Sequence, residues 1–364
     1  MKLSQRIYNL RGKALKSAGD YIPEMSFKRK RMMMKNQSII KNIIWSTVFI
    51  LLVSASLARL HSQTVKQNAD QLILAKGSLK FLIISDWGRD GIHDTNKKTP
   101  GQLKVAKQFG VTSQKIHASF IVTCGDNFHD GGVKALADPF WKVNYENVYT
   151  ATSLMIPWYI TLGNHDYEGN VEAELEYAKT SKRWIQPGRY FSFTKKIQDS
   201  TSILFLVLDS SPFIQSYQND ERDKHHVKDQ DTTAQVLWCD SILSTSKAKW
   251  KFVFFHHPAY SASSTHGSTL EIQNTFVPLF EKYHVDACFS GHDHDLQHSR
   301  PENSAVEYFG CGGGSETRPA GKSSFTKFSK ASLGFGVVSV SRSTMKFSFI
   351  NEKGMRIYTY EINK

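Results

Sequence analysis

Cysteine is scarce in this chain, with four residues among 364. So few thiols cannot form the disulfide framework of a small secreted domain, and none belongs to a C-x-x-C redox pair. Internal repeats and low-complexity tracts are also missing, which excludes solenoids and coiled-coil rods. With 40% hydrophobic and 22% charged residues, the chain can bury a large core, and global disorder is not expected.

Basic residues are in excess, at a net charge of +13, but they are unevenly distributed. Residues 1–42 contain eleven Lys or Arg against two Asp or Glu, so +9 lies in this short segment. The rest of the chain therefore accounts for only +4. No RNA- or DNA-binding motif accompanies the basic segment, and we expect no nucleic-acid partner.

One apolar run near the N-terminus could cross a membrane. Residues 43–58 are sixteen residues without a charge, a helix of about 24 Å against a hydrocarbon core of about 30 Å. Adding Ile39 and Ile40, with the Lys41 side chain reaching to the interface, gives a workable length. Basic side chains are concentrated before the run, so the positive-inside rule places a basic tail, residues 1–38, in the cytoplasm.

Two interpretations in which the helix at residues 39–59 directs export remain open, beside a third in which it is a buried core helix. It is either an uncleaved signal-anchor or a signal peptide, because Ser56 and Ala58 fit a small-x-small cleavage site. Both interpretations send the rest of the chain into the secretory pathway, whereas a buried core helix, the third interpretation, would not. We therefore expect a linker at 60–78 and a domain at 79–364 that is lumenal or extracellular on a single-pass membrane protein, or secreted after cleavage.

From residue 79 onward, short apolar runs alternate with helical stretches, and each run ends in a polar cluster. Runs of four to six residues rich in Ile, Val and Phe are typical of buried strands, and the alternation predicts an α/β fold. The expected strands of a central sheet are 80–85, 120–124, 158–162, 203–208, 252–255 and 285–290. The expected helices are 104–110, 170–182, 232–246 and 271–283. Four further strands, at 306–309, 334–340, 345–350 and 356–361, are expected to complete a second sheet, whereas 211–231 and 312–331 have loop composition.

The polar clusters contain side chains that bind metals. Function in α/β sheets collects at the carboxyl edge, so we expect these side chains to lie together. Carboxylates, amide oxygens and imidazoles suit Zn, Fe or Mn, and the lack of a thiolate excludes a structural zinc site. Six ligands exceed the need of one catalytic metal and predict two ions about 3.5–4 Å apart, bridged by Asp126. The candidates are Asp86, Asp126, Asn164, His256, His292 and His294.

The ordered set of clusters resembles the calcineurin-like metallophosphoesterase superfamily, whose blocks run D-x-G, G-D, G-N-H, a lone H and G-H-x-H. More narrowly, the chain looks like the tartrate-resistant, low-molecular-weight purple acid phosphatases. The similarity covers about residues 80–362 and implies a four-layer αββα sandwich of two mixed sheets. The stretches that carry it are 85–88, 125–128, 162–170, 181–184 and 290–297.

The resemblance implies a role for each matching residue. His165 would face the substrate phosphate and His266 would lie near the leaving group, so both are candidate catalytic residues. His225 and His226 lie in a charged loop, and we interpret them as solvated. The first metal, usually ferric in the family, would be bound by Asp86, Asp126 and His294. The second, divalent ion would be bound by Asp126, Asn164, His256 and His292.

One position departs from the family pattern. The family has a tyrosinate ligand in G-D-x-x-Y, and His129 stands in its place here. Imidazole can coordinate a metal but carries no negative charge, so a first site that includes His129 is one charge more positive. This favours two divalent ions over a ferric one. We expect two bound metal ions, Fe, Zn or Mn, of which at least one is divalent.

These observations together predict an acid phosphatase-like metallophosphatase. The expected reaction is hydrolysis of phosphate monoesters by attack of a metal-bound hydroxide. The expected partners are a phosphomonoester substrate and, through the N-terminal helix, a membrane. Two alternatives are a phosphodiesterase that uses the same metals and a membrane-tethered binding protein with a degenerate site.

We predict that residues 60–364 are translocated across a membrane, because basic residues are concentrated before the apolar run. Expression with sealed microsomes should leave this part of the chain protected from added protease. The size of the protected product separates a signal-anchor from a cleaved signal. Digestion of the C-terminal domain from the cytosolic side of intact microsomes would contradict the prediction.

Overall fold

The computed structural model describes residue 47 and residues 77–89, 101–129, 131–197 and 200–364. The chain divides into two units, Met1–Gln67 and Asn68–Lys364, and the fold described below belongs to the second. Within the described ranges, no helix is long and apolar enough to cross a membrane. Residue 47 apart, the predicted basic tail, the predicted membrane helix and nearly all of the predicted linker lie outside the described residues.

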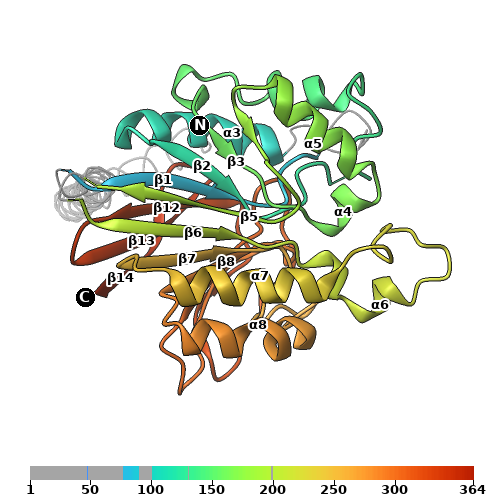
Figure 1. The fold of residues 1–364 in the computed structure, drawn as a ribbon. Helices are drawn as coiled ribbons and strands as arrows, with labels where there is room; N and C mark the ends of the chain where they lie inside the picture. The colour runs from blue at the N-terminus through green and yellow to red at the C-terminus, as the bar shows by residue number, and fades with distance from the viewer. Residues whose placement is uncertain (1–46, 48–76, 90–100, 130, 198–199) are drawn as a thin grey trace, which may run out of the picture. The chain divides into compact units, whose positions relative to one another are not determined.

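Two seven-stranded mixed sheets form the centre of this unit (Figure 1). In the first sheet the strand order is β14-β13-β12-β1-β2-β3-β4. Strands β1 to β4 are parallel, and β12 pairs antiparallel with the other edge of β1. The bounds are β1 Leu79–Ile84, β2 Phe120–Thr123, β3 Trp158–Tyr159, β4 Trp184–Ile185, β12 Gly334–Val340, β13 Thr344–Asn351 and β14 Arg356–Asn363.

The second sheet has the strand order β11-β9-β10-β8-β7-β6-β5. Strands β6, β7, β8 and β10 are parallel, while β5, β9 and β11 are antiparallel to their neighbours. The bounds are β5 Phe191–Lys196, β6 Ser202–Val207, β7 Trp250–Phe254, β8 Ala287–Ser290, β9 Leu296–Ser299, β10 Glu307–Cys311 and β11 Thr326–Lys330.

Helices lie on the outer faces of the two sheets, as Figure 1 shows for α3 and α5 on one side and α7 and α8 on the other. Three apolar layers hold these elements together: one between the sheets and one under each set of helices. The predicted α/β class and four-layer arrangement are therefore confirmed. The helix bounds are α3 Gly101–Ile116, α4 Asn164–Tyr167, α5 Val171–Thr180, α6 Gln215–Gln218, α7 Thr232–Thr245 and α8 Leu270–Lys282.

Aromatic side chains fill the layer between the sheets. The rings of Phe81 and Phe120, from neighbouring strands of the first sheet, stack with centroids 5.0 Å apart. Phe205 from the second sheet meets Phe81 edge-on at 5.4 Å. Pairs of this kind add about 0.5–1.5 kcal/mol beyond the burial of apolar area. The inner faces of the two sheets therefore pack tightly against each other through these rings.

Two predictions about the sheets are wrong. The six runs expected in one central sheet are divided between the two sheets, because 203–208, 252–255 and 285–290 contribute to the second. Strands β12 to β14 do not complete the second sheet; they extend the first, because β12 pairs with β1 from Leu79↔Val340 onward. The predicted loops are also not free of structure, since 211–231 contains α6 and 312–331 contains β11. Helix α3 is longer than predicted, and β4, β5 and β9 were missed. Strand β4 has only two residues, and β9 contains the polar residues Gln297, His298 and Ser299.

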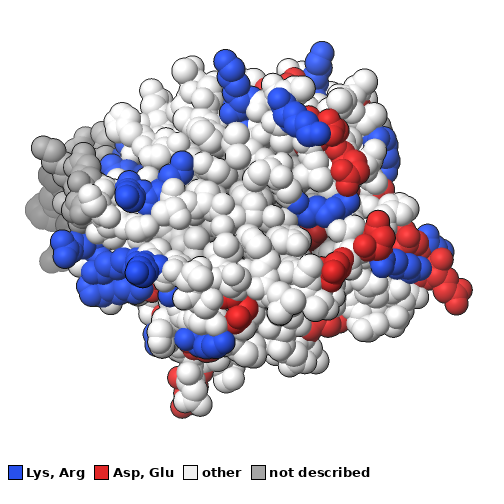
Figure 2. All heavy atoms as spheres, viewed as in Figure 1, with Lys and Arg blue, Asp and Glu red and all other residues white. Residues whose placement is uncertain are grey.

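On the face of the molecule that Figure 2 shows, positive and negative side chains are mixed. Lys and Arg side chains appear there in small separate groups, several of them beside Asp or Glu, and much of the surface is uncharged. An example is the loop after α6, where Arg222 pairs with Asp220 at 3.1 Å. This agrees with the location of most of the excess positive charge in residues 1–42.

We predict that Glu174→Gln stabilises the fold at pH 8. Glu174 is fully buried on α5, and neither carboxylate oxygen has a hydrogen-bond partner among the described residues. Burial, together with the nearby Asp166, raises the pKa of Glu174 well above its usual range, against the opposing effect of Arg189. Above about pH 4.3 the unfolded chain loses a proton that the folded chain retains, so folding becomes less favourable by up to about 1.4 kcal/mol per pH unit.

The neutral glutamine avoids this penalty, so the difference in free energy of unfolding should be small at pH 4 and should grow up to pH 8. Urea unfolding at both pH values measures it. Glu176→Gln, an exposed position on the same helix, is the matched control and should show no such growth. A constant difference between wild type and Glu174→Gln across this pH range would contradict the prediction.

Candidate metal centre

The predicted ligand residues all lie at the carboxyl edge of the two sheets. Asp86 and Asp126 follow β1 and β2 of the first sheet, and Asn164 begins α4 just beyond β3. His256 and His292 each stand two residues after a strand of the second sheet, β7 and β8. The edge where the sheets meet therefore collects the oxygen donors and His129 from the first sheet and the other imidazoles from the second.

Three of these residues have an unusual backbone. Asp86, Asp126 and His292 have φ values of 54°, 49° and 68°, in the left-handed region. This conformation costs about 1–2 kcal/mol for a residue other than glycine. It persists because the turns hold one another: the His292 N–H donates to Asp86 Oδ2 at 3.1 Å. A Cβ at Gly163 would lie 2.2 Å from Asp126 Oδ1, so only glycine fits this close approach.

One group of donors consists of Asp86, His129 and His294, all buried. The Nε2 atoms of His129 and His294 are 3.0 Å apart, and His294 Nε2 is 3.4 Å from Asp86 Oδ1. This Asp86 oxygen is buried without a hydrogen-bond partner among the described residues. Burial lowers the pKa of His129 to about 3, so its ring is neutral and has a lone pair to donate. His129 thus lies beside Asp86 and His294, the residues with which it was predicted to bind the first metal.

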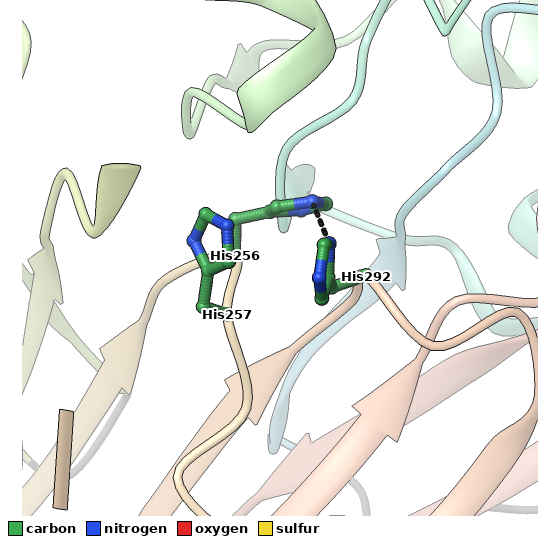
Figure 3. A group of neighbouring side chains, drawn as sticks. All are labelled: His256, His257 and His292. Carbon is green, nitrogen blue, oxygen red and sulfur yellow. Dashed lines mark hydrogen bonds between the residues drawn. The ribbon is translucent and has the colours of Figure 1, made fainter. Parts of the chain in front are cut away.

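A second group surrounds His256. Its Nε2 is 3.1 Å from Asn164 Oδ1 and 3.2 Å from His292 Nδ1, the contact drawn as a dashed line in Figure 3. The other nitrogen, Nδ1, is 2.8 Å from the Cys124 carbonyl oxygen. A proton on Nδ1 then leaves the Nε2 lone pair directed at the cluster. His257, also drawn in Figure 3, has both ring nitrogens engaged elsewhere, by Ser210 at 2.9 Å and Tyr217 at 3.2 Å.

Asp126 connects the two groups. Its Oδ2 atom lies 3.4 Å from His256 Nε2 and 3.9 Å from His129 Nε2, while Oδ1 accepts a hydrogen bond from the His165 N–H at 3.0 Å. Burial alone would raise the pKa of Asp126, but the adjacent His256 and His165 hold it well below the usual range. A charged oxygen between two clusters of donors is the arrangement that a bridging ligand requires.

The donor set fits two divalent or trivalent cations of the Zn, Fe and Mn type. It contains only carboxylate, amide and imidazole donors, which these metals accept. Lone pairs converge from both groups, and a positive charge between them would satisfy the partnerless Asp86 oxygen. The hydrogen bond from the His292 N–H to Asp86 Oδ2 joins two of the left-handed turns without an ion.

The two candidate catalytic histidines contact different donor groups of this cluster. The ring of His165 is 4.1 Å from that of His129, and its Nδ1 is 3.2 Å from Glu168 Oε1. The ring of His266 is 4.1 Å from that of His292. His165 thus accompanies the first group and His266 the second. Burial lowers the pKa of His165, but Asp126 and Glu168 outweigh it and raise the value, whereas burial, opposed by Asp293, lowers the pKa of His266.

Several supporting residues were missed by sequence reasoning. Asp166, directly after the G-N-H block, accepts hydrogen bonds from the N–H groups of Gly163 at 2.8 Å and Phe128 at 3.0 Å. It thereby ties the second block of the motif to the third. Its place in Gly163-Asn-His-Asp was visible in the sequence, but nothing there indicated that the carboxylate faces backbone donors of another turn.

The interpretation of His225 as solvated is wrong. Its ring is buried and stacks on Tyr217, with centroids 3.9 Å apart. The Glu168 carboxylate, which already contacts His165, lies 3.7 Å from His225 Nε2 and 2.7 Å from Lys224 Nζ. Glu168 therefore connects the charged loop, through Lys224 and His225, to His165 beside the first donor group. The neighbouring His226 is exposed, as predicted.

Comparisons with known proteins agree with this geometry. The chain is 35% identical to purple acid phosphatase 4 of Arabidopsis thaliana, over 79% of the chain and 84% of that protein. It is 31% identical to the human tartrate-resistant acid phosphatase type 5, over 78% and 90%. Among solved structures it matches GAP50, described as the anchor in the inner membrane complex of Plasmodium, with TM-score 0.68 and 27% identity over 79% and 89%.

The family assignment rests on the sequence itself. Residues 79–296, which contain all the candidate ligands and both candidate catalytic histidines, match the calcineurin-like phosphoesterase family. The blocks occur in the order that the family shows, and their side chains meet at one sheet edge. The chain therefore belongs to the calcineurin-like phosphoesterase family.

Proposed function

We propose that this metal-dependent phosphatase hydrolyses phosphate monoesters with two metal ions bridged by Asp126. The family and its purple acid phosphatase relatives support phosphoester hydrolysis. The observation that carries the dinuclear proposal is the position of Asp126 Oδ2, within 4 Å of an imidazole nitrogen of each donor group. The first ion would be held by Asp86, Asp126, His129 and His294, and the second by Asp126, Asn164, His256 and His292.

Such ions, when bound, neutralise phosphate oxygens and activate a water for attack on phosphorus. The protein supplies orientation and charge around them. His165, whose pKa is raised, offers a positive charge to the phosphate beside the first group. We assign to His266, whose ring lies beside that of His292, the transfer of a proton to the leaving alkoxide. Because its Nε2 is 2.9 Å from Arg318 Nη1, which only donates, that proton would be carried on Nδ1. His165 is partly accessible and His266 is exposed, as contact with substrate requires.

A second candidate function follows from one comparison. Because the chain is 27% identical to a protein described as a membrane-complex anchor, a binding role without hydrolysis is the alternative. Metal analysis of the purified domain, with a monoester and a diester assayed in parallel, separates the possibilities. Two ions per chain and preference for the monoester support our proposal. Preference for the diester indicates a phosphodiesterase, and absence of metal and of turnover indicates an anchor.

We also propose that the domain acts outside the cytosol. The support is the charge asymmetry around residues 43–58 and the small number of acidic residues that precede them. A tether at residues 39–59 would keep the enzyme at a membrane, whereas cleavage after it would release the enzyme. The protease-protection experiment above tests this location.

We predict that Asp126→Asn abolishes activity and lowers the metal content by more than one ion per chain. The amide keeps the shape but loses the charge that both ions would share. Elemental analysis and a monoester assay measure the two effects. Asp229→Asn, at an exposed position, is the control and should retain both metals. A variant that keeps both ions and most of its turnover would rule out the bridging role.

We predict that the iron-loaded wild type is colourless or pale, because His129 provides no tyrosinate for a ferric charge-transfer band. The variant His129→Tyr, loaded with iron, should gain a broad visible absorption and retain iron more firmly. His226→Tyr, which changes an exposed histidine, serves as the control and should stay colourless. If His129→Tyr binds iron without colour, residue 129 does not reach the metal, contrary to the 3.0 Å contact with His294.

A further inference from the structure

We propose that Glu316 is a positioning residue for the first metal, acting through the imidazole of His294. This inference rests on the proposed dinuclear function. Glu316 lies between β10 and β11, in a segment that the sequence showed only as a loop. Its carboxylate nevertheless reaches the back of a buried candidate ligand.

The contact joins the side of the His294 ring that faces away from the donors. Glu316 Oε1 is 2.9 Å from His294 Nδ1, while Nε2 on the opposite side of the ring faces Asp86 and His129. At this separation the carboxylate is close enough to accept a proton placed on Nδ1, and such a proton would leave the Nε2 lone pair for the metal. A carboxylate behind a metal-bound imidazole fixes the tautomer and ring orientation and makes the nitrogen a stronger donor.

Residues next to Glu316 fix this arrangement independently of the Glu316 side chain. The Arg318 N–H donates to the His294 carbonyl oxygen at 2.8 Å, so the segment that carries Glu316 is tied to the strand turn that carries His294. The Ser315 hydroxyl also donates to the Asp86 carbonyl oxygen, at 2.5 Å. Residues on both sides of Glu316 are thus anchored to two candidate ligands of the same metal.

Two arginines compete for the same carboxylate. Arg89 forms an ion pair with Glu316 Oε2, and Arg318 Nη2 is 3.4 Å from Oε1. Both guanidinium groups are always charged and therefore oppose the binding of a cation nearby. Removing the charge of Glu316 should weaken the first metal, whereas removing an arginine charge should strengthen it. A residue that only supports the fold would not produce effects of opposite sign.

The test is a titration of the metal-free full-length protein with Zn²⁺ against a competing chelator, which gives an affinity for each ion. Glu316→Gln should weaken the more affected ion by about tenfold, within the 10–100-fold usual for such partners. Glu316→Ala should weaken it further, and Glu316→Asp should restore part of the loss. Arg89→Gln should bind this ion more tightly than wild type. Glu302→Gln, at an exposed position in the same part of the chain, is the matched control.

A spectroscopic signature separates action through His294 from a general loss of charge. In the Zn²⁺-loaded protein, NMR of ¹⁵N-labelled histidine should show one strongly hydrogen-bonded Nδ1 proton that disappears in Glu316→Ala and returns in Glu316→Asp. Wild type without two bound ions would defeat the dinuclear proposal itself. Two results would overturn only the role of Glu316, provided that wild type binds two ions. One is an unchanged metal affinity in Glu316→Gln, and the other is weaker binding in both Glu316→Gln and Arg89→Gln.

Discussion

The position of the Asp126 carboxylate constrains the rest of this domain. Its Oδ2 atom faces His129 on the first sheet's side and His256 from the second sheet, so the two sheets have to present their strand ends at one edge and at one separation. The aromatic layer between the sheets fixes that separation, because close-packed rings such as Phe81 and Phe205 cannot slide without loss of contact. The apolar core is therefore part of the metal centre's geometry.

The same site imposes a cost on stability. Asp166 is fully buried against the turns that carry candidate ligands, and burial raises its pKa to about 7, while left-handed backbone strains three of those ligands. Such features are destabilising unless function or a bound ligand compensates for them. Because ions that bind only the folded state stabilise it by mass action, metal binding would offset part of this cost. The fold and the site thus depend on each other energetically.

The sequence predicted most of what short-range patterns encode. Apolar runs that end in Asp86, Asp126 or His256 were recognised as strands, and those ligand candidates do meet at one edge. Sheet membership was harder, because nothing within the sequences of β12 to β14 indicates which sheet they join, and only long-range pairing places them beside β1.

The missed supporting residues have the same cause. The role of Glu316 depends on a contact with His294 that no spacing in the sequence reveals, and His225 became buried through a partner 57 residues earlier in the chain, Glu168. The fold alone does not decide between hydrolysis and anchoring, since one scaffold hosts several functions. The site does bear on the choice: an anchor would gain nothing from strained turns at Asp86 and His292 that direct donors inward. The strained turns are present, and His129, which replaces the family tyrosine, can still coordinate a metal. Both observations favour a centre that binds metal.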